Sequence, residues 1–228
     1  MISISYLFEV ENIELVNPEL KEYIESKIIP MYDKHDSGHR QDHVKLVMNT
    51  ALDLAVKRKV DVNMTFAAAA YHDVGIPKGR EEHHINSAKF VLADKNLKKW
   101  FTEEQIKDIA DACEDHRASN PNTPRTLLGK IIQDSDKTPS LKLMIKRSYL
   151  YGKDNYLDMD REQLIQRSFD HLSNKFGEKG YAKYYLPETK KSIQKEQQKI
   201  YKKLKNFNTF KKEVDKVILP NGDVKEGV

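Results

Sequence analysis

The sequence has very few residues that cross-link or interrupt a chain. It contains one cysteine, Cys113, among 228 residues, so no disulfide can form within the chain and a reducing compartment is expected. No stretch approaches the roughly 18 to 20 apolar residues of a membrane span, and no basic segment precedes the short apolar run at the N-terminus. These absences predict a cytoplasmic protein with no signal peptide and no membrane partner.

Neither sign of charge dominates. The 39 Lys and Arg residues nearly balance the 35 Asp and Glu residues, and the net charge of +4 makes a nucleic-acid partner unexpected. The basic excess collects between Lys190 and Lys216, where we expect a solvated helix face rather than a surface that follows phosphates. Oligomeric state is not predicted by these features.

With only eight prolines and nine glycines, most of the chain shows apolar residues at helical spacing. The pattern predicts successive helices to about residue 218, beginning near residues 18, 41, 63, 84, 102 and 127 and continuing with at least three more. The expected fold class is therefore all-α.

The stretch AAAAYHDVGIPKG, Ala67 to Gly79, combines a buried helix with two polar residues. Asn63 is a good N-cap for this helix, and the Gly and Pro that follow the pair are stop signals. His72 and Asp73 therefore stand at its last turn, where buried polar side chains need partners.

Further His and Asp residues lie on or beside apolar stripes of other predicted helices, namely His43, His83, His116 and Asp136. Several inward imidazoles and carboxylates are not satisfied by chance backbone carbonyls, whereas one divalent cation can satisfy them together. The negative end of the helix dipole adds a small contribution of about 0.5 to 1 kcal/mol. The residues therefore predict a buried metal site.

Three blocks, DHVKLVMNTA, YHDVGIPKG and IIQDSDKT, resemble in this order the motifs of the HD-domain superfamily of metal-dependent phosphohydrolases. The resemblance spans about residues 38–137. It implies a helical bundle in which His43, His72, Asp73 and Asp136 bind metal.

Two more blocks, HHINSA and CEDHR, resemble those that add histidines in two-metal members of this superfamily. They imply His83 and His116 as further ligands, with the Asp73 carboxylate bridging two ions. The choice of His83 over His84 rests on the register set by Ser87 and Ala88.

The last block departs from the pattern because QDSDK offers two acidic residues. Asp136 is preferred to Asp134 because Lys137 follows it, as a basic residue commonly does in the family. The C-terminal helices also resemble those of a bacterial single-domain branch with extra His ligands. This implies a core at residues 1–155 and a helical extension packed on it at 156–228, frayed at its end.

A metal held by three or four protein groups keeps a position for water and lowers its pKa from about 15.7 to about 7. Together with the resemblance, this implies hydrolysis of a phosphate ester or anhydride, by metal-bound hydroxide, in a nucleotide or small phosphorylated metabolite. One or two divalent ions are expected, and iron, manganese, zinc, nickel and magnesium all suit the ligands.

Basic residues near the ligands are candidates for neutralising the phosphate. We expect Asp73 and Lys78 to act in catalysis, and the substrate to be bound by Lys78, Arg80, Lys137 and Arg147. His39, four residues before His43, is expected to orient that ligand through a hydrogen bond.

Two other functions are compatible with the same ligand set. HD sites with two irons resemble this one and activate dioxygen in oxygenases, and a metal-bound regulatory module would need no turnover. Against the regulatory module, no ligand position is visibly lost from the sequence.

Overall fold

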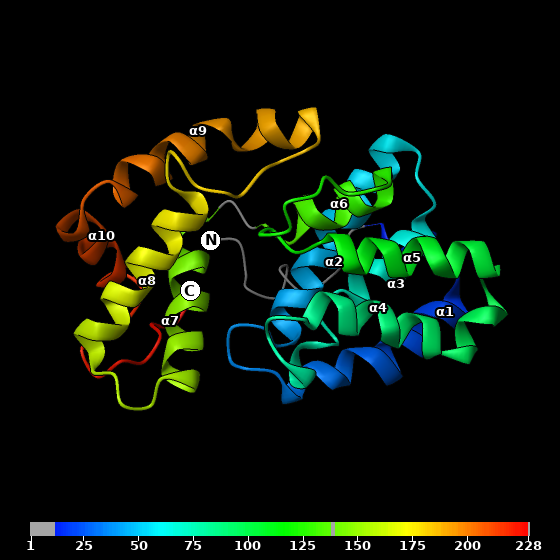
Figure 1. Ribbon diagram of the computed structural model, residues 1–228, viewed down its shortest axis with the longest axis horizontal. Helices are drawn as coiled ribbons and strands as arrows, with labels where there is room; N and C mark the ends of the chain where they lie inside the picture. The colour runs from blue at the N-terminus through cyan, green and yellow to red at the C-terminus, as the bar shows by residue number, and fades with distance from the viewer. Residues whose placement is uncertain (1–11, 138–139, 228) are drawn as a thin grey trace. The chain divides into compact units, whose positions relative to one another are not determined.

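The structure, a computed structural model, describes residues 12–137 and 140–227. These residues form ten α-helices, α1 to α10, with short helical turns between them and no β-strand (Figure 1). The prediction of an all-α fold is therefore confirmed. None of the helices in the described ranges combines the length and the apolar character that crossing a bilayer requires.

The chain divides into two compact units. Of the described residues, 12–35 and 39–137 form the first unit, and 36–38 and 140–227 form the second. The division falls at residue 137, whereas the sequence suggested a boundary at 155, because the intervening helix packs with the C-terminal helices.

The first unit contains six α-helices and five short turns. In chain order they are η2 (Ile13–Leu15), α1 (Pro18–Tyr23), the π-helical turn η3 (Ile24–Ile28), η4 (Ile29–Lys34), α2 (Gln41–Arg58), α3 (Val62–Tyr71), η5 (Ile76–Lys78), α4 (His83–Ala93), η6 (Lys95–Lys99), α5 (Glu103–Asp115) and α6 (Leu127–Ser135).

Helix α3 is the centre of the first unit. It packs against α2, α4, α5, α6 and η3, and its four alanines, Ala67 to Ala70, are completely buried. Small side chains let neighbouring helices approach closely, so this mostly apolar helix is accommodated in the interior.

The N-cap of α3 differs from the prediction. The Asp61 side chain accepts the Met64 amide at 2.9 Å and caps the helix. Asn63 instead accepts the backbone amide of Asn17 through its Oδ1 at 2.8 Å. Sequence patterns alone do not separate two candidate caps that lie two residues apart when one of them is used for a long-range contact.

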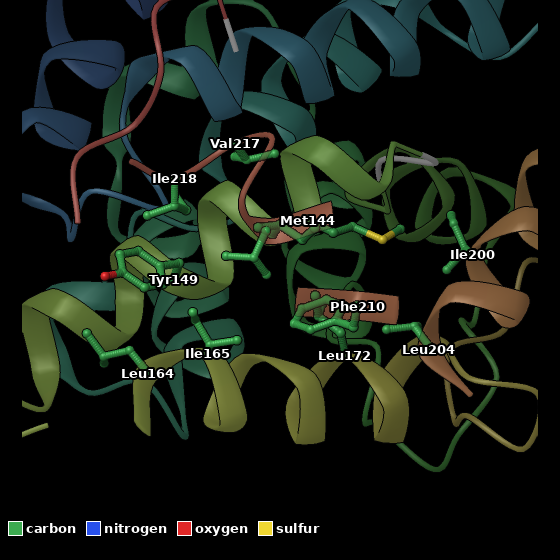
Figure 2. Close-up of a cluster of buried hydrophobic side chains, with 12 residues drawn as sticks. Met144, Tyr149, Leu164, Ile165, Leu172, Ile200, Leu204, Phe210, Val217 and Ile218 are labelled. Atoms are coloured by element: carbon green, nitrogen blue, oxygen red, sulfur yellow. The ribbon is translucent and has the colours of Figure 1, made fainter. Parts of the chain in front are cut away.

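The second unit has its own core. Its helices are α7 (Leu141–Asn155), α8 (Arg161–Phe176), α9 (Pro187–Leu204) and α10 (Phe207–Val214). Figure 2 shows Ile165, Leu172 and Phe210 among the side chains of this core, which draws on all four helices and on the segment that follows α10. An isolated antiparallel bridge between Ile218 and Val224 follows α10.

Replacing Phe210 with Ala is expected to lower the free energy of unfolding of the second unit by about 3 to 5 kcal/mol, because a large aromatic side chain with no exposed surface leaves a cavity. Guanidinium denaturation followed by far-UV circular dichroism measures the change. Leu157→Ala is the control, since Leu157 is 85% exposed and should shift stability by less than about 0.5 kcal/mol. Equal effects for both variants would contradict the assigned core.

Candidate metal centre

The end of α3 presents the first two candidate ligands. His72 follows the last helical residue and Asp73 stands in the turn after it, and both side chains are buried. The tyrosine Tyr32 holds this turn, since its hydroxyl donates to the Ala70 carbonyl at 2.9 Å and accepts the Asp73 amide at 3.3 Å. The turn is therefore fixed from a neighbouring element before any ion binds.

Four of the predicted ligands form one group. His43 from α2 and Asp136 from the end of α6 approach the His72–Asp73 pair, and the ligand atoms lie within 4.8 Å of one another. The Nε2 atom of His43 is 3.1 Å from Asp136 Oδ1 and 3.6 Å from Asp73 Oδ2. His72 Nε2 is 3.3 Å from the same Asp73 oxygen.

A second group forms on the other side of the Asp73 carboxylate. The Nε2 atoms of His83 and His116 each lie 3.3 Å from Asp73 Oδ1 and 3.2 Å from each other. Asp73 thus offers one oxygen to each group. The predicted bridging role of Asp73 requires such a position between the two groups.

Backbone hydrogen bonds orient three of the four histidines. The Nδ1 atoms of His72, His83 and His116 each face the carbonyl oxygen three residues earlier, at 2.7, 2.7 and 2.6 Å. An imidazole that donates from Nδ1 presents the lone pair of Nε2, so each ring is set in the tautomer that a metal needs.

The charge states of Asp73 and His83 are consistent with ligation, whereas at His72 burial is outweighed by the Asp73 carboxylate, which raises the pKa of that imidazole. Burial raises the pKa of Asp73, but the imidazoles of His72, His116 and His43 outweigh burial and hold the pKa well below its usual value. Burial, aided by His116 and Arg80, lowers the pKa of His83 to about 3, so that ring is neutral at physiological pH. An ionised carboxylate and a neutral imidazole are the forms that bind metal.

The two groups fit divalent ions. His72 Nε2 and Asp73 Oδ1 are buried and make no hydrogen bond in the described residues, which is costly without a cation. Metal–nitrogen and metal–oxygen bonds of about 2.0 to 2.2 Å place neighbouring ligand atoms about 3.0 to 3.5 Å apart. The separations of 3.1 to 3.6 Å quoted above fall in or near that range.

The geometry favours Asp136 over Asp134, and His83 over His84, as a metal ligand. Asp134 belongs to neither group, and one of its oxygens lies 3.6 Å from the Lys137 ammonium. His84 also belongs to neither group, and its ring stands edge-on to that of His83 at 5.6 Å. The ligand assignments themselves stay predictions.

The predicted substrate contacts are scattered. Arg80 is exposed beside the second group and lends its carbonyl to His83 Nδ1. Lys78 belongs to neither group and lines a surface groove between η3 and α4. The Lys137 side chain is fully buried and ion-paired with Asp134, an arrangement of a structural residue rather than an accessible one.

Arg147 lies on α7 in the second unit, where its Nε donates to the Gly38 carbonyl at 2.8 Å. Its contact with substrate stays a prediction. His39 is buried, and its ring stands edge-on to that of His43 with centroids 5.8 Å apart. This places His39 next to the ligand that it was predicted to orient.

A close approach between the turn and α4 was not predicted. Gly75 donates its amide to Ser87 Oγ at 3.0 Å, and a Cβ atom on Gly75 would clash with the carbonyl oxygen of His83. Only glycine allows the turn that carries Asp73 to touch the first turn of α4. The Gly75 and Ser87 positions therefore help to hold the two groups together.

One comparison with known proteins covers the residues of this site. The family model described as the HD domain matches residues 40–140, a range that contains all six candidate ligands. Residues 40–140 are therefore similar to the HD domain. A comparison with curated proteins gave no significant match.

Among solved structures, the chain is similar to a predicted HD superfamily hydrolase from an uncultured Thermotogales bacterium. The two share 24% sequence identity over 72% of this chain and 90% of that chain, with a TM-score of 0.48.

Replacing His83 with Asn is expected to remove one of two bound ions per chain, because the second group loses one of its two imidazoles. Metal content of the purified variant, measured by plasma mass spectrometry, checks this. The matched control His84→Asn removes the adjacent imidazole and should leave the content unchanged. Loss of metal in the control alone would make His84 the ligand.

Proposed function

We propose that the chain is a metal-dependent phosphohydrolase that cleaves a phosphate ester or anhydride in a nucleotide or other small phosphorylated metabolite. The observation that carries the proposal is the position of Asp73, with one oxygen 3.3 Å from His72 Nε2 and the other 3.3 Å from His83 and His116. Two ions about 3.5 to 4 Å apart form a recurrent arrangement in phosphatases and nucleases.

The ligand residues and Arg80 have different roles in the proposed reaction. The six candidate ligand side chains would hold the ions, and Asp73 belongs to both groups. Bound ions would supply a water of lowered pKa and positive charge beside the phosphate. Arg80, exposed at the edge of the second group, is placed to neutralise charge on the phosphate oxygens as the bond to the leaving group breaks.

The experiment begins with protein purified without added metal, whose metal content is determined before and after chelation. The protein is then incubated, in that metal, with nucleoside mono-, di- and triphosphates, pyrophosphate and sugar phosphates, and released phosphate is measured. We expect release from at least one of these compounds, loss of release with chelator, and recovery when the metal is restored.

The di-iron oxygenase uses the same ligands and gives a different result. Oxygen uptake by the reduced, iron-loaded protein with no phosphate released from any compound would replace the proposed reaction with oxygenase chemistry. Bound metal without phosphate release or oxygen uptake would favour a regulatory module. Protein that takes up no metal would overturn the site itself.

A further inference from the structure

A groove on the first unit lies apart from the metal centre. It has a volume of about 580 Å³ and is lined by residues from α1, η3, η4, η5 and α4 and by Asp94, which follows α4. None of the six candidate ligands lines it. Its volume is in the range of about 300 to 1,000 Å³ found for small-molecule sites.

Three lysines from three separate elements converge on the groove. Lys27 belongs to η3, Lys78 to η5 and Lys89 to α4, and all three are exposed. Within the described residues, no carboxylate lies within 4 Å of any of the three ammonium groups. The sequence predicted Lys78 as a phosphate contact. In the structure, Lys27 and Lys89 line the same groove.

Among the described residues that line the groove, Asp94 carries the one carboxylate, and it is already hydrogen-bonded. Its Oδ2 accepts the hydroxyls of Tyr23 at 2.6 Å and Tyr71 at 2.5 Å. Its Oδ1 accepts the backbone amide and side-chain amide of Asn96 at 3.0 and 3.1 Å. Asp94 therefore stabilises the groove wall and forms no ion pair with the three lysines.

The rest of the lining is apolar. Ile28, Met31 and Phe90 supply aliphatic, thioether and aromatic surface beside the lysines, and Ala93 stands at the end of α4. Apolar walls with a few convergent polar groups are typical of sites for small organic molecules.

We propose that this groove binds a small organic anion, with its negative head on Lys27, Lys78 and Lys89 and its apolar body against Met31 and Phe90. This site goes beyond the proposed hydrolase reaction, because it uses no metal ligand. Phosphate, carboxylate and sulfonate heads share the chemistry that the three ammonium groups recognise.

The single tryptophan offers a local signal. The ring of Trp100 lies 5.4 Å from that of Tyr23, which lines the groove. The probe is 8-anilinonaphthalene-1-sulfonate, titrated into the full chain in EDTA while Trp100 emission is followed. Phenyl phosphate and octanoate then compete with the bound probe, which separates a phosphate from a carboxylate preference. EDTA makes the result independent of the metal centre.

The variant Lys27→Gln/Lys78→Gln/Lys89→Gln removes the three charges and is expected to weaken probe binding on the order of tenfold, from three exposed charge contacts. Its matched control is Lys57→Gln/Lys59→Gln/Lys107→Gln, which removes three exposed lysines elsewhere in the same unit. The control should bind as the wild type does. Ala93→Phe fills the groove without changing charge and should also weaken binding.

Saturable quenching that both groove variants reduce, with displacement by phenyl phosphate or octanoate, would support the site. Equal binding by wild type and the triple groove variant would overturn it. Equal weakening by the two triple variants would also overturn it, since net charge alone would then explain the affinity. Displacement by neither competitor would overturn the assignment of an anion with an apolar body.

Discussion

Replacing Asp73 with Asn is expected to remove both ions and to lower the rate of phosphate release by about three orders of magnitude, equivalent to about 4 kcal/mol of transition-state free energy. The substitution keeps the shape of the side chain and removes the charge shared by the two groups, whose imidazole nitrogens lie 3.3 Å from its oxygens. Metal content and initial rates on the same preparation measure the two effects together.

The control for this variant is Asp42→Asn, which makes the same chemical change at an exposed carboxylate next to His43 in the chain. We expect normal metal content and normal rates. An Asp73→Asn protein that retained two ions, or that lost activity while its metal content was unchanged, would contradict a bridging role. Far-UV circular dichroism establishes that both proteins are folded.

Replacing Gly75 with Ala is expected to lower the free energy of unfolding of the first unit by about 2 to 3 kcal/mol, because the added carbon overpacks a backbone contact. The new Cβ would clash with the His83 carbonyl and lie 2.6 Å from the Ser87 amide nitrogen, so the first turn of α4 must move. Because this turn carries His83, occupancy of the second metal position should fall as well. Thermal denaturation monitored by Trp100 emission, together with metal analysis, measures both effects.

Gly79→Ala separates steric displacement from backbone strain. Gly79 has a φ of 124°, which strains any L side chain, but a Cβ there meets no atom within 4 Å. This variant should lose about 1 to 2 kcal/mol of stability and keep its metal. If both glycine variants kept full occupancy, the contact at Gly75 would not position His83.

Much of helix α3, and of the His72–Asp73 pair that follows it, could be predicted from the sequence. Four alanines before a Gly-X-Pro stop define a buried helix, and the structure buries Ala67 to Ala70 completely. Periodicity also places His43 and His116 on inward faces, so a bundle brings them near His72 and Asp73. The family resemblance then selects His83 and Asp136 from adjacent candidates.

Contacts between residues far apart in the chain could not be predicted from the sequence. The Tyr32 hydroxyl accepts the amide of Asp73, which lies 41 residues further along the chain, and no local sequence pattern predicts such a contact. Lys137 and Lys78 look equivalent as basic residues near ligands. The structure buries Lys137 against Asp134 and leaves Lys78 exposed in a groove, because side-chain direction depends on neighbours far apart in the chain.

The two-ion site is tested most directly by an anomalous-difference map from crystals of protein loaded with its own metal. We expect two peaks about 3.5 to 4 Å apart, with the Asp73 carboxylate between them. One peak should lie beside Nε2 of His43 and His72, and the other beside Nε2 of His83 and His116. An absent peak at both positions, or metal bound by Asp134 or His84, would contradict it.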